Sequence, residues 1–480
     1  MKEDALRALD EALRAGASYA DVRVVRCRRQ LIAAEDERIA QVSDEERFGF
    51  GVRVIADGAW GFASSDLVSA EEMCRIAREA VAIAKASATA LEKPVSLVPE
   101  PVREDEFRGP CERDPFAVDL SEKTGLLLEI HRRLLAHPDV KKAHSRMYFD
   151  RVERLLVTSE GSILESDVYT ADISYQATAV DQSDARSRTY HPPPRTAGYE
   201  HINAQDLLEN TTRVAEQAAE HLRAPECQPC VTDLILDPGH LALTMHESIG
   251  HATELDRALG MEESLAGRTF ATPDKLGKMR YGSELMNIIA DNTLPGGLAS
   301  IGFDDEGVEA QRWDIVKEGI FVGYGTSREV AGVIGLERSR GCCRADSHAS
   351  IPIVRQPNFY LAPGKEPLSP EDLIADTKEG IYIEGRGSFS IDQMRLNFQF
   401  GGDAFWKIKN GKLCGMLKNV TYQAITPEFW GSLDAICDER FWVLDGVLNC
   451  GKGDPMQLAR MSHGSATARF RQISVGQATK

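Results

Sequence analysis

Two histidines five positions apart in one predicted helix constrain the local backbone more than any other feature of this sequence. Asp237-Pro238 predicts the start of this helix, because an Asp N-cap followed by Pro at the first helical position is a typical start signal. The helix expected over about residues 239–259 contains His246 and His251. At about 100° per residue, positions i and i+5 of an α-helix point about 140° apart. One wider turn of about 4.4 residues brings them within about 50°. Both side chains can therefore reach one metal ion only if the helix contains a π-bulge or a similar distortion.

The same segment has the pattern H-E-x-x-x-H, which is the zinc-protease motif H-E-x-x-H with one extra residue. His246 and His251 are therefore candidate zinc ligands, and Glu247 is the candidate general base beside them. Gly250 makes the required distortion easier because it lacks a Cβ. The pattern predicts metal-assisted hydrolysis.

A catalytic zinc takes three protein ligands, so a third ligand is expected elsewhere. Spacing leaves several candidates open: Glu254, Asp256, Cys342, Cys343, His348, Cys414, Cys437, Cys450 and His463. Cys450 lies in the glycine-rich stretch 449–453, which we interpret as an exposed turn that can bring a thiolate to a metal on another element. We expect four other cysteines to be small buried apolar residues: Cys27, Cys74, Cys414 and Cys437.

Predicted helices are few and do not alternate regularly with strands, which favours an α+β class over repeated βαβ units. A helix is expected over residues 3–15 with Leu6, Leu9 and Leu13 on its buried stripe. Strands over 49–55 and 59–63 are expected to form a hairpin through Asp57-Gly58, a favoured tight-turn pair. Short separate strands are expected over 20–27 and 30–35, with a proline-rich linker over 90–120.

We divide the chain into three predicted domains. They are an N-terminal α+β domain (1–92), a middle α+β domain (93–225) and a larger, strand-rich C-terminal domain (226–480) that carries the metal-binding helix. At roughly 150 residues per domain, a chain of 480 residues is expected to form two or three domains.

Composition excludes several other classes of protein. The net charge of −18 argues against broad nucleic-acid binding, which needs a basic face. No apolar stretch approaches the length of a transmembrane helix, and the acidic N-terminus lacks the apolar region of a signal peptide. The ten cysteines are therefore interpreted as reduced thiols of a cytoplasmic protein with no membrane or nucleic-acid partner.

Two further motifs have simpler interpretations. Cys227-x-x-Cys230 is interpreted as a loop entering a strand, because adjacent Cys342-Cys343 has the wrong spacing to complete a four-cysteine zinc site. The run 304–306, Asp-Asp-Glu, is interpreted as a solvated acidic loop, with a calcium site as the alternative.

The sequence resembles the TldD/PmbA family, and in particular its TldD-type member, over nearly the whole chain. The resemblance rests on the strand pair at 49–54 and 60–63, on 158–162, on the run Met245 to Asp256, on 449–453 and on 462–464. It implies a zinc metalloprotease that acts on unfolded or flexible peptides. It further implies that His246, His251 and Cys450 hold Zn²⁺, with Glu247 catalytic, in a homodimer or a heterodimer with a PmbA/TldE-type subunit.

Two alternative functions fit the same residues. The first is a non-catalytic regulatory or interaction subunit in which a zinc is structural. The second is an amidohydrolase acting on non-peptide substrates, which would use the same metal chemistry. The intact Glu247 favours an enzyme, because a purely structural site needs no base beside its ligand. The oxyanion donor is not identified, although His463 is a candidate.

Overall fold

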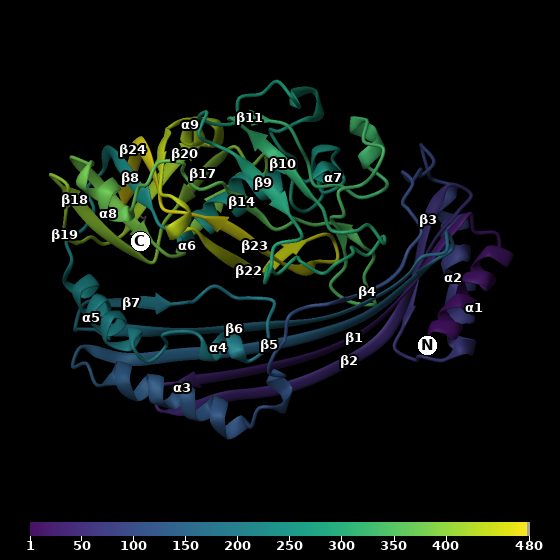
Figure 1. Cartoon of the computed structure of the whole chain (residues 1–480), viewed down its shortest axis with the longest axis horizontal. Coiled ribbons are helices and arrows are strands. Elements are labelled where there is room, and N and C mark those ends of the chain that lie inside the picture. Colours follow the sequence, from purple (N-terminus) through teal and green to yellow (C-terminus); the bar gives the residue numbers. More distant parts are fainter. Residues whose placement is uncertain (478–480) are drawn as a thin grey trace.

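A long, curved sheet forms the base of the molecule in the computed structural model, which describes residues 1–477 (Figure 1). Its strands follow the order β3-β2-β1-β5-β6-β4, and β7 also pairs with β6. All pairs are antiparallel except β4 with β6, which are parallel. The strands are β1 (Tyr19–Glu35), β2 (Arg38–Ala56), β3 (Ala59–Ser65), β4 (Glu104–Arg108), β5 (Val140–Thr158), β6 (Ile163–Val180) and β7 (Ala185–Tyr190).

The predicted hairpin is confirmed, with β2 and β3 joined through Asp57 and Gly58. Both turn residues have positive φ, 50° and 80°, as a tight hairpin turn of this kind requires. The prediction of separate short strands over 20–27 and 30–35 is wrong, because both lie in the single strand β1. A strand of this length needs neighbours along its whole course, and β1 pairs with both β2 and β5 over nearly all its residues.

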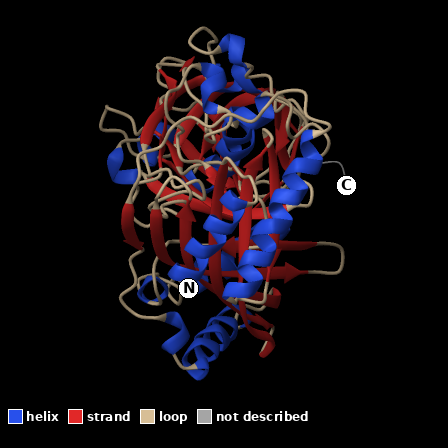
Figure 2. Ribbon diagram, turned by 90° about the vertical axis from the view of Figure 1, so that its right-hand side faces the viewer, coloured by secondary structure: helices blue, strands red, loops and turns tan. Residues whose placement is uncertain are grey.

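Helices cover the sheet at its start and on its convex side. They are α1 (Lys2–Arg14), α2 (Ala70–Ala88), α3 (Leu120–Leu135), α4 (Glu200–Asn203) and α5 (Asn210–Arg223). Figure 2 views the molecule from the end at which α1 and α2 lie. Leu9 of the stripe predicted in α1 is buried, but Leu6 and Leu13 are 36% and 42% exposed. The buried face of α1 consists mainly of alanines, since small side chains allow α1 and α2 to approach closely.

The segment predicted as a linker, 90–120, contributes β4 to the sheet. Strands from before and after residue 92 thus share one sheet, in which β1 pairs with both β2 and β5. The boundaries that we placed at 92/93 and 225/226 remain predictions.

The C-terminal half lies over the concave side of the long sheet (Figure 1) and contains two further large sheets. One follows the order β16-β17-β20-β24-β8-β15-β18-β19, with β21 also on β24, and the other the order β11-β10-β9-β14-β23-β22. The first contains β8 (Cys230–Leu236), β15 (Glu379–Glu384), β16 (Phe389–Ile391), β17 (Asn397–Phe400), β18 (Ala404–Lys409), β19 (Lys412–Met416), β20 (Val420–Ile425), β21 (Leu433–Ile436) and β24 (Ala468–Gln477). The second contains β9 (Ile288–Asp291), β10 (Arg312–Lys317), β11 (Ile320–Phe321), β14 (Phe359–Leu361), β22 (Val443–Lys452) and β23 (Gln457–Ser465), while β12 (Cys343–Arg344) and β13 (Ile353–Val354) pair separately.

The largest apolar core joins these two sheets around the helix α6 (Pro238–Met245). Leu241 and Met245 of α6 are fully buried in it, together with Leu234 of β8 and Phe359 of β14. The shorter helices α7 (Leu255–Ala258), α8 (Pro370–Ala375) and α9 (Thr426–Gly431) complete this half. The core fixes the end of α6 between two sheets, and the α+β class is confirmed.

Two general expectations can be compared with the structure. Among residues 1–477, no helix is both long and apolar enough to cross a bilayer. All ten cysteines lie in this range and are unpaired. The burial predicted for four of them holds for Cys437, whereas Cys27 and Cys74 are half-buried and Cys414 is exposed.

Candidate metal centre

The chain changes from α-helix to π-helix at the first histidine of the motif. The carboxylate of Asp237 caps α6 by accepting a hydrogen bond from the backbone N–H of His240 at 2.7 Å. Residues 246–250 then form one π-turn, in which the N–H of His251 donates to the carbonyl of His246 five residues earlier. The predicted distortion is confirmed. The single helix predicted over about 239–259 is wrong in its extent, because a 3₁₀ turn and a break at Glu254 follow the π-turn.

Gly250 leaves room for the close approach of a side chain from a neighbouring segment. A Cβ at this position would collide with the side-chain oxygen of Gln356. The Gln356 side chain approaches closely enough for its Nε2 to donate to the carbonyl of His246 at 3.2 Å. The glycine thus lets a neighbouring segment brace the π-turn.

Three side chains that can bind a metal converge at this turn. His246, His251 and Cys450 are all buried, and each offers one ligand atom within 4.8 Å of the others. The Cys450 Sγ lies 3.5 Å from the His251 Nε2. Cys450 belongs to β22 and pairs with Ala459 of β23, so the exposed turn that we predicted for 449–453 is wrong. Strand pairing places the Cys450 thiol in the interior, whereas an exposed turn would have placed it in solvent.

The other ring nitrogen of each histidine is held by a second side chain. The His246 Nδ1 lies 2.8 Å from the His463 Nε2, and the His251 Nδ1 lies 2.9 Å from a carboxylate oxygen of Glu254. Such partners orient a ligating imidazole and fix its tautomer. Burial lowers the pKa of His246 well below its usual range and lowers the pKa of His251 to about 3. Both rings are therefore neutral at neutral pH, which is the form that binds metals.

Glu254 and Asp256, two of the alternative ligands, instead surround a buried lysine. The Lys452 Nζ lies 2.8 Å from both carboxylate oxygens of Asp256 and 3.3 Å from an oxygen of Glu254. Burial alone would raise the pKa of Glu254, but Lys452 and then His251 hold it well below its usual range. Glu254 is thus a carboxylate that links His251 to a fixed positive charge. Lys452 was not predicted from the sequence.

Glu247 lies against an arginine that sequence reasoning missed. Arg395 lies in the loop between β16 and β17, and its Nη1 donates to a Glu247 carboxylate oxygen at 2.6 Å. Burial raises the pKa of Glu247, and the guanidinium opposes this rise. The two residues are 148 positions apart, and no local pattern connects them.

The remaining candidates do not belong to this cluster. The only group of three His, Cys, Asp or Glu side chains within residues 1–477 that could hold a metal is His246, His251 and Cys450. His348 bonds to Asp66 at 2.6 Å, and Cys230 is exposed at the start of β8. His463 is explained as the partner of His246.

The prediction of a solvated acidic loop at 304–306 is wrong. Asp304, Asp305 and Glu306 are at most 4% exposed. Asp305 pairs with Arg154 at 3.1 Å, and Glu306 pairs with Arg53 at 3.3 Å. Arginines of the long sheet compensate Asp305 and Glu306, and three backbone N–H groups donate to the carboxylate of Asp304, which allows the acidic run to be buried.

The known proteins that this chain resembles are named as metal-dependent peptidases, which agrees with a metal centre at this site. Three domains of the PmbA/TldA metallopeptidases match the chain: domain 1 at residues 20–84, the central domain at 113–224 and the C-terminal domain at 229–477. A metalloprotease of Methanocaldococcus jannaschii is 30% identical over 90% of this chain and 92% of its own length. A protein of Saccharolobus solfataricus named zinc metalloprotease TldD homolog is 23% identical over 96% of this chain and 97% of its own.

The fold is shared with solved structures of the same kind. TldE of Thermococcus kodakarensis superposes with a TM-score of 0.78 at 16% identity, covering 98% of this chain and 100% of its own. The chain belongs to the PmbA/TldD family, as its sequence motifs predicted. The names of its relatives support a metallopeptidase.

Proposed function

We propose that this protein is a zinc-dependent peptidase that cleaves unfolded or flexible peptides. In this proposal His246, His251 and Cys450 hold the zinc, and Glu247 is the general base. The observation that carries it is the convergence of three buried ligand atoms within 4.8 Å beside an acidic side chain. The names of the relatives support the same reaction class.

The donor set fits zinc. Two neutral imidazoles and one thiolate are ligands that zinc accepts readily. Tetrahedral bonds of about 2.0 Å to nitrogen and about 2.3 Å to sulfur separate the two donor atoms by about 3.5 Å. The distance between the His251 Nε2 and the Cys450 Sγ is 3.5 Å. Burial raises the pKa of the Cys450 thiol, so the thiolate depends on the metal for its stabilisation. Three protein ligands leave one position open for chemistry.

A bound zinc supplies Lewis acidity, which polarises a carbonyl and makes water a stronger acid. Glu247 accepts the proton of the attacking water and returns it to the leaving amine. Arg395 fixes the Glu247 carboxylate and favours its ionised form, which is the form a base needs. His463 and Glu254 keep the two imidazoles in a fixed orientation and tautomer.

The partner and location are part of the same proposal. We expect a cytoplasmic dimer, either of this chain or with a PmbA/TldE-type subunit. The likeness to TldE over the whole chain supports a partner of similar shape. Light scattering of the purified protein, alone and mixed with such a subunit, distinguishes the two assemblies.

The test measures zinc content and cleavage of an unstructured peptide in parallel. We expect about one zinc per chain in the wild type, a loss of zinc in His246→Ala and Cys450→Ala, and retained zinc without cleavage in Glu247→Ala. His144→Ala and Cys414→Ala, at exposed positions, are the matched controls and should change neither quantity.

Two outcomes contradict the proposal. Zinc that is unaffected by Cys450→Ala places the third ligand elsewhere. Zinc bound normally in a wild type that cleaves no peptide, alone or with a partner subunit, favours the interaction subunit or an amidohydrolase with other substrates.

A further inference from the structure

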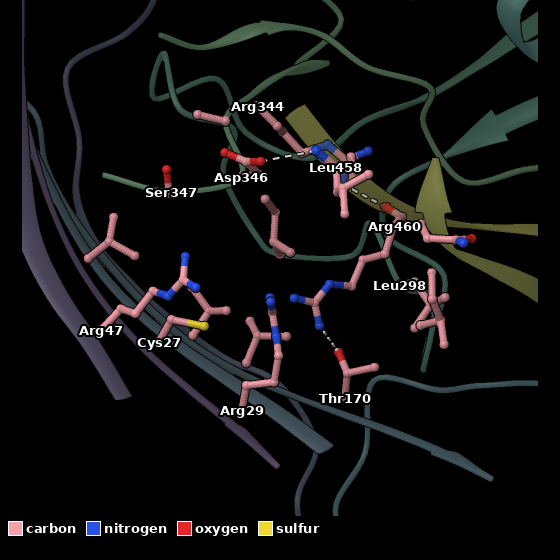
Figure 3. A pocket seen from close by; sticks show the side chains of 18 of the residues that line it. Cys27, Arg29, Arg47, Thr170, Leu298, Arg344, Asp346, Ser347, Leu458 and Arg460 are labelled. Carbon is pink, nitrogen blue, oxygen red and sulfur yellow. Dashed lines mark hydrogen bonds between the residues drawn. The ribbon is translucent and has the colours of Figure 1, made fainter. Parts of the chain in front are cut away.

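A cavity of about 430 Å³ lies between the concave face of the long sheet and the C-terminal half (Figure 3). Alternate residues of β1 and β5 line it, because side chains two positions apart share one face of a strand. Segments around residues 298–301, 344–348 and 448–460 form its other wall. Its lining is rich in guanidinium groups: Arg29, Arg47, Arg146, Arg154, Arg344 and Arg460.

Two of these arginines form only long ion pairs with neighbouring carboxylates. The side chains of Arg47 and Arg146 are 69% and 46% exposed. Their nearest carboxylates, Glu45 and Asp172, are at 3.7 Å and 3.5 Å, so neither guanidinium is saturated with short hydrogen bonds. The lining holds six arginines against three acidic residues, Glu45, Asp172 and Asp346, and this positive excess contrasts with the net charge of −18 for the whole chain. A ligand with carboxylates is attracted here and repelled elsewhere.

A buried carboxylate holds two more of the arginines in place. Asp150 is fully buried and contacts both Arg460 and the Nε of Arg29, the latter at 3.3 Å. Figure 3 shows Arg29 and Arg460 pointing toward each other from the two walls. Arg460 also donates to Thr170 at 2.6 Å. Two cations share one anion, so the group keeps a net positive charge in a fixed position.

The form of the cavity indicates which anion it accepts. The arginines are spread over several strands and alternate with apolar residues, among them Val168, Leu298 and Leu458. A phosphate site has several donors that converge on one point, as a tight cluster of arginines, a glycine-rich loop or a helix N-terminus provides. Dispersed charges between apolar patches suit a chain that carries carboxylates at intervals.

The cavity and the candidate metal centre share one hairpin. β22 and β23 supply Cys450 to the metal cluster, and the same strands supply Asn449 and Arg460 to the cavity. We propose that the cavity is a subsite for the acidic side chains of a peptide substrate. This assignment rests on the proposed peptidase function and adds a preference for acidic segments to it.

The test compares two short unstructured peptides that differ only in Glu against Gln at several positions. Binding is followed by fluorescence anisotropy with Glu247→Ala, which is not expected to cleave, and cleavage is followed with Glu247 intact. Each is measured with and without the double variant Arg47→Gln/Arg146→Gln. The control is Arg26→Gln/Arg28→Gln, which removes the same charge from β1 side chains that pair with Glu46 and Asp44 outside the cavity.

We expect the acidic peptide to bind about tenfold more tightly than its Gln counterpart, and the cavity variant to lose about that factor. The control variant should keep the preference. Equal binding of both peptides, or an equal loss in both double variants, overturns the subsite. A preference that is present in binding while no peptide is cleaved supports the cavity and overturns the peptidase. Cleavage of both peptides with no preference for the acidic one supports the peptidase and overturns the acidic subsite.

Discussion

Two buried charged clusters in this molecule have different consequences for function. The metal-site cluster comprises His246, His251, Cys450, Glu254 and Lys452 and lies within the C-terminal half. The domain-contact cluster joins the long sheet to that half through Arg23, Arg53, Arg154, Asp305 and Glu306. Both lie almost entirely out of solvent, so burial of charge alone does not identify a functional site.

The difference between them is the state of their donors. In the domain-contact cluster Asp305 pairs with two guanidinium groups and Glu306 pairs with one. These carboxylates are therefore occupied by protein partners, and the cluster is a structural contact. In the metal-site cluster the Nδ1 of each histidine is held, while a thiol faces the Nε2 of His251. The donor atoms of His246, His251 and Cys450 thus converge on one point, which is the pattern that a bound metal ion would need.

The largest effect is expected at Glu247. Glu247→Gln should reduce kcat/KM by about 10²- to 10⁴-fold, because general acid–base catalysis contributes that range. Zinc content and the unfolding temperature should stay close to the wild type. Steady-state kinetics and metal analysis on the same preparations check this. Retained activity would place the base elsewhere and remove the functional contrast between the clusters.

Asp305→Asn should affect stability and not chemistry. It leaves Arg23 and Arg154 buried without their carboxylate, which typically costs about 3 kcal/mol or more. Urea unfolding should report the loss, whereas kcat/KM well below the unfolding transition should change little. Asp274→Asn at an exposed position is the control. A large loss of activity in the folded variant would mean that this contact also serves the site.

Glu254→Gln should weaken metal binding without abolishing it. Removing the carboxylate partner of a ligating histidine typically costs about 10- to 100-fold in metal affinity. Competition with a chelator measures this change. Glu263→Gln, on an exposed side chain nearby, should leave affinity unchanged. Unchanged affinity in Glu254→Gln would show that Glu254 only neutralises Lys452.

The smallest effect concerns acid stability. Burial raises the pKa values of Asp150 and Asp305, but the combined attraction of their arginine partners and their hydrogen bonds lowers both below the usual range. The partners are Arg460 and Arg29 for Asp150, and Arg154 and Arg23 for Asp305. Their stabilisation is present above the unfolded pKa of about 3.9 and is lost as the pH falls through the lower folded pKa. The free energy of unfolding should therefore decline below about pH 5, by at most about 1.4 kcal/mol per pH unit for each group. Urea midpoints measured in steps of pH should show a shallower decline for Asp150→Asn than for the exposed control Asp10→Asn. Equal slopes would contradict it.

Much of the local chemistry was readable in the sequence. The Asp237-Pro238 cap, the five-residue spacing of the histidines and Gly250 together predicted the π-turn, because helical geometry is local. The Asp57-Gly58 hairpin was predicted for the same reason. The spacing did not choose the third ligand, and only the family resemblance pointed to Cys450.

What the sequence by itself determined is therefore the class, the family and the two histidines with their glutamate. Only the tertiary structure brought Cys450, Arg395 and Lys452 to them, because side chains about 150–200 positions apart meet through strand pairing and loop packing. It also decided that the acidic run 304–306 is buried, since the compensating arginines lie on distant strands. Local geometry is encoded in neighbouring residues, whereas the partners of a buried charge are fixed only when the whole chain packs.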